Sequence, residues 1–263
     1  MGNYIVTGAN GGMGSAVSRM LSEEGHRVYG IDRMFSDGEA PWRRIAADTT
    51  DAAALQAAFD CVREEAGALD GIVHTAGIYD LNSLLEMPEA DFVRDFDVNL
   101  FGVFRVNRLF APLLKPGGRI VIVSSELAPL FPLPFTGVYA ATKTAVEAYA
   151  DALRMEMQLL GQPVVVIRPG ALRTNMLPAS TAKLDRFCRS TERYRFNAAR
   201  FSRIVNAVET RSVPPETVAR VIGRALTARR PRLVYCVNRN PLLLLLNALP
   251  KRLQLRIIRA VLS

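Results

Sequence analysis

A glycine-rich turn between an apolar strand and a helix restricts the fold more than any other feature of the sequence. The strand is expected at Asn3–Thr7 and the turn at Gly8–Gly14, and an amphipathic helix then runs to about Gly25. Glycines in such a turn let the backbone approach a pyrophosphate closely, and the N-terminus of the following helix faces its negative charge. These elements therefore indicate the first unit of a dinucleotide-binding domain.

The remaining sequence alternates apolar strands with helical segments. Further strands are expected at Arg27–Ile31, Ile45–Ala47, Gly71–His74, Arg119–Ser124, Pro163–Arg168 and Arg232–Val237. This alternation predicts an α/β fold of the Rossmann type, a doubly wound parallel sheet of about seven strands with helices on both faces. With 263 residues, no internal repeat and no linker, the chain is expected to form a single domain over residues 1–263. Residues 175–213 are arginine-rich and poorly patterned, which predicts an irregular, mobile lid over a substrate site.

Charge and composition exclude some classes of function. The net charge is +8, and residues 183–263 hold 18 basic and 4 acidic side chains, which favours anionic surfaces or substrates unless the arginines are simply solvated. Nucleic-acid binding is not expected, because these arginines alternate with leucines and lack an aromatic stacking platform. Three scattered cysteines and two histidines leave little material for a metal site, so no metal is expected. Without a signal-peptide pattern, the expected location is cytoplasmic.

The second strand ends in an acid, Asp32, 18 residues after Gly14. A carboxylate here would bind the adenosine ribose hydroxyls and repel a 2′-phosphate, which favours NAD over NADP. Arg33 could pair with that phosphate and keeps NADP as the alternative. Asp32 could also serve only as a strand-end cap.

Tyr139 and Lys143 are four residues apart on an expected helix, so they lie on one face. An ammonium near a phenol favours the phenolate and lowers its pKa, so the pair could exchange a proton with an alcohol or ketone near pH 7. Ser124 and Ser125 end the fifth strand, at the edge of the sheet where ligands bind.

Taken together, several ordered motifs resemble the short-chain dehydrogenase/reductase family over about residues 3–237. They are Thr7-Gly8-x-x-x-Gly12-x-Gly14, Asp32, Asp48, Ala76-Gly77, Asn99, Ser125, Tyr139-x-x-x-Lys143 and Pro169-Gly170-x-x-x-Thr174.

The resemblance implies catalytic roles for four residues. Tyr139 would be the general acid/base, and Ser125 would hold and polarise the substrate oxygen. Lys143 would bind the nicotinamide ribose and lower the Tyr139 pKa, while Asn99 would hold a water relay behind Lys143. Besides Tyr139 and Lys143, the cofactor would contact Gly8, Asn10, Gly11, Gly12, Met13, Gly14, Asp32, Arg33, Asp48, Thr49, Thr75, Ala76, Gly77, Pro169, Gly170 and Thr174.

Two departures from the family pattern affect the site. His74-Thr75 replaces the usual pair of asparagines, which is expected to change local bracing more than chemistry. The segment between Ser125 and Tyr139 is one residue longer than the commonest family spacing, so Ser124 remains an alternative to the favoured Ser125.

The last residues, 240–263, form an apolar and basic tail. Five consecutive leucines precede a helix expected at Lys251–Leu262, which carries arginines on one face and aliphatic residues on another. This tail could lie on a membrane surface, cover an apolar substrate site or contact another subunit. It resembles the tails of hydroxysteroid- and retinol-active members of the family, which implies a small hydrophobic substrate.

The resemblance implies reversible hydride transfer between a nicotinamide and a secondary alcohol or ketone, in a homodimer or homotetramer. The alternative is a catalytically idle sensor of NAD and NADH on the same fold. The intact set of Asn99, Ser125, Tyr139 and Lys143 argues against that alternative.

Overall fold

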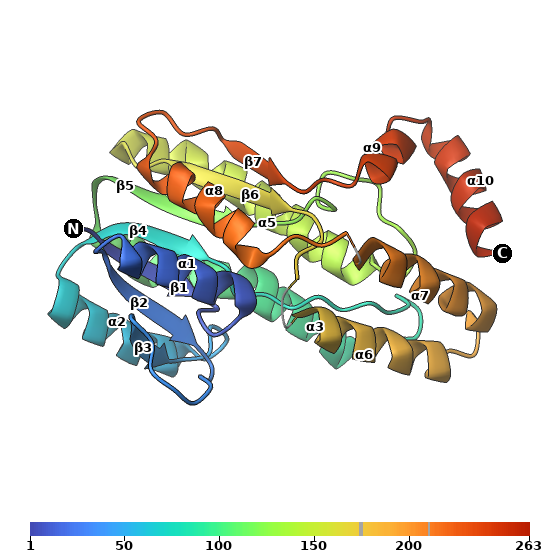
Figure 1. Cartoon of the computed structure of the whole chain (residues 1–263), viewed down its shortest axis with the longest axis horizontal. Coiled ribbons are helices and arrows are strands. Elements are labelled where there is room, and N and C mark those ends of the chain that lie inside the picture. The colour runs from blue at the N-terminus through green and yellow to red at the C-terminus, as the bar shows by residue number, and fades with distance from the viewer. Residues whose placement is uncertain (174–175, 210) are drawn as a thin grey trace.

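The computed structural model describes residues 1–173, 176–209 and 211–263. Over these residues the chain forms a seven-stranded parallel sheet in the order β3-β2-β1-β4-β5-β6-β7 (Figure 1). The strands are β1 Asn3–Thr7, β2 Arg27–Asp32, β3 Arg43–Ala46, β4 Leu69–His74, β5 Leu114–Val123, β6 Val164–Pro169 and β7 Val234–Val237. The predicted α/β fold class is confirmed. The strand order changes direction between β1 and β4, and ligands bind at such a switch point in open α/β sheets.

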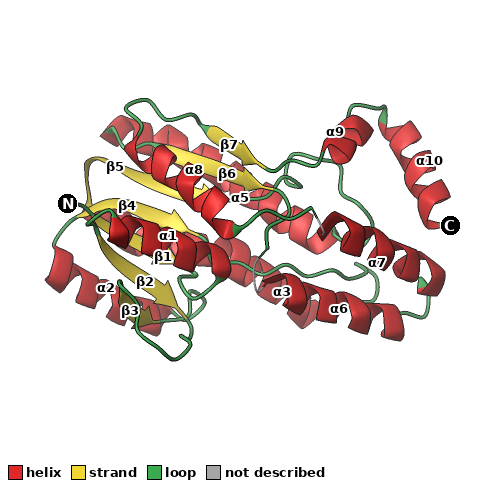
Figure 2. Ribbon diagram, in the orientation of Figure 1, coloured by secondary structure: helices red, strands yellow, loops and turns green. Residues whose placement is uncertain are grey.

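Helices cover both faces of the sheet (Figure 2). They are α1 Gly12–Glu23, α2 Ala52–Ala66, α3 Glu89–Phe96, α4 Gly102–Phe110, α5 Gly137–Met157, α6 Met176–Ser190, α7 Arg195–Glu209, α8 Pro215–Thr227, α9 Pro241–Asn247 and α10 Lys251–Leu262. One core holds buried residues of α1 and α8, and the other holds those of α2, α4 and α5.

The central strands are buried on both faces, which explains why they read as unbroken apolar runs. Ile5 of β1 pairs in register with Ile72 of β4, and both side chains are fully buried toward α2, α4 and α5. Their neighbours Val6 and Val73 point to the opposite face, toward α1 and α8. Because side chains alternate along a strand, one pairing register fills both cores.

The segment predicted to be irregular is helical, so that prediction was wrong. Helices α6 and α7 lie beyond the carboxyl ends of the strands (Figure 1). Leu184 and Phe187 of α6, and Ala198 and Phe201 of α7, point into a small third core. That core also contains Leu81, Phe135 and Leu262. The arginines of both helices are exposed to solvent.

The tail forms two helices, α9 and α10, with α10 at the predicted bounds. It packs on α7, where the Asn197 side-chain amide donates a 2.8 Å hydrogen bond to the Leu262 carbonyl. Leu262 is buried in the third core. Among the described helices, none combines the length and the apolar character needed to cross a bilayer.

Candidate active site

A cavity of about 350 Å³ opens where β1, β4, β5 and β6 end. Its inner part is lined by the glycine loop, the turn after β4, the loop after β5, the start of α5 and the end of β6 with the residues that follow it. The sequence-predicted residues in its wall are Gly8, Gly11, Gly12, Met13, Gly14, Thr75, Gly77, Ser124, Ser125, Tyr139, Lys143, Pro169 and Gly170. The cavity therefore brings together the proposed catalytic residues, apart from Asn99, and most of the loop residues expected to contact a cofactor.

The glycine loop has no room for side chains at two positions. Gly8 has a φ of +70°, and a Cβ there would lie 2.6 Å from the Ala76 backbone nitrogen. A Cβ on Gly14 would lie 2.1 Å from the Gly8 carbonyl oxygen and 2.6 Å from the Thr75 hydroxyl. Since α1 begins at Gly12, its free backbone N–H groups face the cavity, as binding of a pyrophosphate requires. These residues fit a dinucleotide.

Asp32 and Arg33 lie beyond the glycine loop and outside the cavity wall. The Asp32 carboxylate accepts a 2.9 Å hydrogen bond from the Asn10 backbone N–H, so it does brace the loop as a cap would. The Asn10 side-chain oxygen accepts hydrogen bonds from the backbone and hydroxyl of Ser36. Arg33 is exposed beside this cluster. The end of β2 thus presents one acid and one base to the solvent next to the loop.

Three further predicted contacts, Asp48, Thr49 and Ala76, fall outside or behind the wall. The Asp48 carboxylate accepts hydrogen bonds from the Thr50 backbone and hydroxyl, which fixes the turn after β3. The Thr49 side chain is buried against Gly102 on α4, whose Cβ would lie 2.8 Å from the Thr49 hydroxyl. The Ala76 backbone N–H donates a 3.4 Å hydrogen bond to the Thr7 hydroxyl, directly before the glycine loop. Thr174 lies outside the described residues.

Tyr139 sits in the cavity wall beside Ser125. Burial raises the pKa of Tyr139 to about 12; a hydrogen bond with Ser125 lowers it and the nearby Glu126 charge raises it. The Lys143 ammonium lies 5.8 Å from the centre of the Tyr139 ring. The net pKa of Tyr139 is therefore above its usual value in this structure, because removal of the phenolate from water outweighs the other influences, and the lowering of that pKa by Lys143 stays a prediction.

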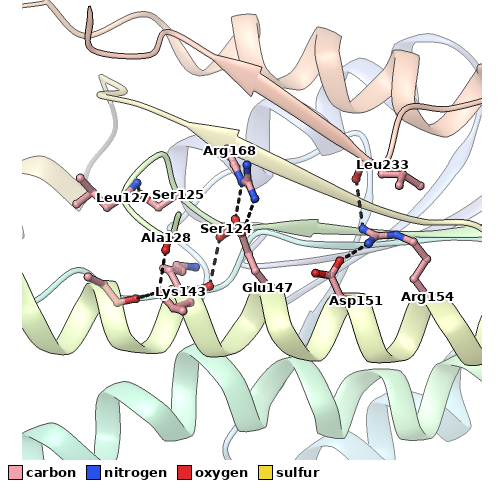
Figure 3. A network of polar contacts seen from close by, with 12 residues as sticks. Ser124, Ser125, Leu127, Ala128, Lys143, Glu147, Asp151, Arg154, Arg168 and Leu233 are labelled. Carbon is pink, nitrogen blue, oxygen red and sulfur yellow. Dashed lines mark hydrogen bonds and ion pairs between the residues drawn. The ribbon is translucent and has the colours of Figure 1, made fainter. Parts of the chain in front are cut away.

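Lys143 is buried one helical turn after Tyr139. Its ammonium donates a 3.1 Å hydrogen bond to the Val123 carbonyl at the end of β5. Burial lowers the pKa of Lys143 to about 8, and the charge of Glu147 opposes that shift. Glu147 accepts two hydrogen bonds, of 2.8 and 2.5 Å, from the guanidinium of Arg168 on β6 (Figure 3). This ion pair fixes the acid that supports the Lys143 charge.

The two serines after β5 make different contacts (Figure 3). The Ser124 hydroxyl is buried and donates to the Lys143 backbone carbonyl at 3.5 Å. The Ser125 hydroxyl accepts from the Leu127 backbone N–H at 3.2 Å and hydrogen-bonds with Tyr139. Ser125 is therefore the serine that contacts Tyr139, which favours it over Ser124.

Asn99 lies behind the cavity, in a π-helical turn at Asp97–Phe101 between α3 and α4. Its side chain accepts a 2.8 Å hydrogen bond from the Ile78 N–H and donates to the Ile78 carbonyl and the Thr142 hydroxyl, each at 3.0 Å. Thr142 directly precedes Lys143, so Asn99 ties the loop after β4 to the segment of α5 that carries Lys143. π-Helical turns are frequent at functional sites.

Sequence reasoning expected a lid at 175–213 and offered the tail as one possible cover of an apolar site, but it named none of the residues in the outer part of the cavity. Its wall there consists of Glu126 and of apolar side chains from the loop before α5, from α7 and from α9: Leu133, Phe201, Ile204, Val205, Leu242 and Leu243. Glu126 directly follows a predicted residue and could have been found by position. The apolar residues come from helices distant in sequence, and no local pattern indicates that they meet.

The family assignment agrees with this geometry. The chain belongs to the short chain dehydrogenase family, whose model matches residues 3–185. It is therefore an oxidoreductase with a Rossmann-type nucleotide-binding fold. No group of His, Cys, Asp and Glu that could hold a metal occurs among the described residues.

Two relatives and one solved structure illustrate the similarity. A 3-ketodihydrosphingosine reductase of Bacteroides thetaiotaomicron is 26% identical, over 86% of this chain and 84% of that protein. A 17-beta-hydroxysteroid dehydrogenase type 6 of Rattus norvegicus is 33% identical, over 66% of this chain and 58% of that protein. The ligand-free aldohexose dehydrogenase of Thermoplasma acidophilum superimposes with a TM-score of 0.75 at 21% identity, covering 91% of this chain and 95% of the other. That last likeness shows the fold alone.

Proposed function

We propose that this oxidoreductase interconverts a lipophilic secondary alcohol and its ketone, with Tyr139 as the general acid/base. The observation that carries the proposal is the convergence of Ser125, Tyr139 and Lys143 with the glycine loop in one largely apolar cavity. A nicotinamide dinucleotide, when bound, supplies or accepts the hydride. The protein supplies position and the proton.

Each residue has a separate task in the proposed reaction. The Ser125 hydroxyl donates a hydrogen bond to the substrate oxygen and polarises it. Tyr139 donates its phenol proton to that oxygen in reduction and removes the proton in oxidation. Lys143 holds a ribose hydroxyl and contributes a positive charge, and Asn99 positions the Lys143 segment through Thr142.

The proposed cofactor is NAD, with NADP as the alternative. Asp32 ends β2 next to the glycine loop and hydrogen-bonds to it, which is a suitable position for a ribose diol and unfavourable for a 2′-phosphate. Arg33 follows it on the surface and is the group that would favour NADP. The two cofactors are therefore compared directly in the experiment below.

An apolar outer wall supports a lipophilic substrate. Side chains of α7 and α9 enclose the cavity there, and the two relatives act, by their names, on a ketosphingoid and on a hydroxysteroid. A hydrocarbon chain or ring buried against such a wall contributes about 25 cal/mol for each Å² removed from water.

The proposed assembly is a homodimer or homotetramer, with peripheral membrane contact through the tail. Phe101 and Phe104, at and after the Asn99 turn, are 46% and 44% exposed, as expected of a face covered by a second subunit. Leu242 and Leu245 of α9 are exposed, and α10 adds arginines that would attract an anionic surface.

The test is turnover of hydrophobic secondary alcohols and ketones with NAD(H) and NADP(H), with Tyr139→Phe alongside. Tyr149→Phe is the matched control, because Tyr149 is also on α5 but its hydroxyl accepts from Asn107, outside the cavity. We expect turnover in the wild type and the control, and its loss in Tyr139→Phe. Tight NADH binding without turnover of any substrate would favour the sensor instead.

A further inference from the structure

Glu126 is an acid in the wall of an otherwise mainly apolar cavity. Of the described residues that line the cavity, Glu126 and Lys143 are the charged ones. Glu126 directly follows Ser125, and its side chain is only 7% exposed. The proposed reaction uses Ser125 and Lys143 and leaves this carboxylate without a function.

One backbone contact and two side-chain contacts hold Glu126 in place. Its backbone N–H donates to the Pro169 carbonyl at 2.9 Å, which ties the β5 loop to the end of β6. One carboxylate oxygen accepts a 2.7 Å hydrogen bond from the Asn240 N–H, where α9 begins. The other oxygen lies against Gly170, where a Cβ would be 2.9 Å away. The carboxylate is therefore held rigidly between the reacting centre and the apolar outer wall.

No described cation lies within ion-pair distance of this carboxylate. The Lys143 ammonium donates to the Val123 carbonyl instead. Burial raises the pKa of Glu126, and the Asn240 hydrogen bond and the charge of Arg239 oppose that rise. A buried carboxylate without a cation is costly, and a cation brought by a ligand would remove that cost.

We propose that Glu126 binds an ammonium group of the substrate, carried on a carbon close to the one held by Ser125 and Tyr139. The substrate class is then a long-chain amino ketone and the corresponding amino alcohol. Glu126 lines the same cavity as Ser125 and Tyr139 and directly follows Ser125, which is why the two polar groups of the substrate are proposed to lie close together; Leu242, Leu243 and Phe201 enclose the hydrocarbon chain. This inference rests on the proposed function and names its substrate class.

A purely structural role for Glu126 makes a different prediction. If the side chain serves only to hold Asn240 at the start of α9, a neutral acceptor would suffice. Glu126→Gln retains an oxygen that can accept from the Asn240 N–H and removes the charge. The two roles therefore separate in this single variant.

The first experiment compares 2-aminododecan-3-one with dodecan-3-one as substrates. We expect the wild type to prefer the amino ketone by about 10- to 100-fold in kcat/KM, which is the range for a hydrogen bond to a charged group. Glu126→Gln should lose this preference mainly through KM and still reduce dodecan-3-one. Glu64→Gln, at an exposed site on α2, is the control and should behave as the wild type. Equal turnover of both ketones by the wild type, or an equal loss on both in the variant, would overturn the proposal.

A second measurement does not need turnover. With NADH bound, dodecan-3-amine should raise the melting temperature of the wild type more than dodecan-3-ol does, and Glu126→Gln should abolish the difference. If the amine effect depends on Glu126 while no ketone is reduced, the ammonium site stands and the proposed reaction fails. If ketones are reduced through Tyr139 but the amine gives no extra stabilisation, the reaction stands and the ammonium site is wrong.

Discussion

Acidification should destabilise this protein through one buried residue, His74. It ends β4 and is 2% exposed, and its Nε2 lies 2.8 Å from the Asn107 side-chain oxygen. The pKa of His74 is lowered from 6.5 to about 4, mainly by burial; the hydrogen bond with Asn107 opposes this shift and the charge of Lys143 adds to it. As the pH falls, the unfolded chain therefore binds a proton at this position at a higher pH than the folded chain does.

The magnitude follows from that difference. Because the folded-state pKa is depressed, stability is unaffected above pH 6.5 and falls as the pH decreases from 6.5 toward about 4. At pH 5 the difference corresponds to about 2 kcal/mol of unfolding free energy, and its full extent to about 3 kcal/mol.

The perturbation is His74→Gln, whose amide can still donate to Asn107 but does not titrate. Urea unfolding of wild type and variant at pH 7.5 and pH 5 gives two differences in unfolding free energy. The pH-independent effect of the substitution on stability cancels between the two differences. Relative to the wild type, the unfolding free energy of the variant should therefore be about 2 kcal/mol larger at pH 5 than at pH 7.5. His26→Gln, at the half-buried second histidine, is the control. An unchanged difference at the two pH values would refute the reasoning.

Three further predictions concern other parts of the site and its supports. Asp95 is fully buried without a hydrogen-bond partner, and burial raises its pKa to about 7. The folded protein therefore loses stability as the pH rises above 3.8, where the unfolded chain releases this proton first. In urea unfolding, Asp95→Asn should stabilise the protein by about 2 kcal/mol at pH 8 and not at pH 4. Gly14→Ala should abolish NADH binding in a fluorescence titration, because its Cβ would lie 2.1 Å from the Gly8 carbonyl oxygen, whereas Gly11→Ala, with 3.2 Å to the same atom, should weaken binding about tenfold or less. Glu147→Gln should lower the Lys143 pKa below its value of about 8, so NADH binding should weaken at a lower pH than in the wild type; an unshifted binding profile would contradict this role of Glu147.

The sheet could be predicted from sequence because its strands are buried on both faces. A run such as that in β5 needs no partner to be recognised as apolar. The α6–α7 segment could not be predicted in the same way. Leu184 and Phe187 are separated by one helical turn, but they bury themselves against Leu81 and Phe135, which are far away in sequence. Where distant residues supply the core, local pattern carries little information.

The same distinction between local and distant contacts applies to the site. The relative positions of Tyr139 and Lys143 follow from helical geometry, and the glycine loop follows from its own spacing. The protonation states of Tyr139 and Lys143 cannot be predicted from local sequence, because their pKa values depend mainly on burial by the whole fold. The position of the Glu126 carboxylate likewise could not be predicted, because it depends on α9 packing over the cavity and on the hydrogen bond from the Asn240 N–H.

The direction of the proton transfer should follow from the high pKa of Tyr139. A phenol with a pKa of about 12 is protonated at neutral pH and ready to donate, whereas the oxidation of an alcohol requires the phenolate. At saturating NADH, where loss of the Lys143 charge does not limit the rate, we therefore expect ketone reduction to be nearly independent of pH between 6 and 9, and at saturating NAD we expect alcohol oxidation to rise steadily over the same range. The Glu126 charge contributes to the high value, so Glu126→Gln should move the rise in oxidation rate to lower pH, while Glu64→Gln should not. Initial rates in both directions across this range measure the effect with a substrate that carries no amine, such as dodecan-3-one and its alcohol. An oxidation profile that Glu126→Gln leaves in place would mean that the carboxylate does not act on the Tyr139 proton.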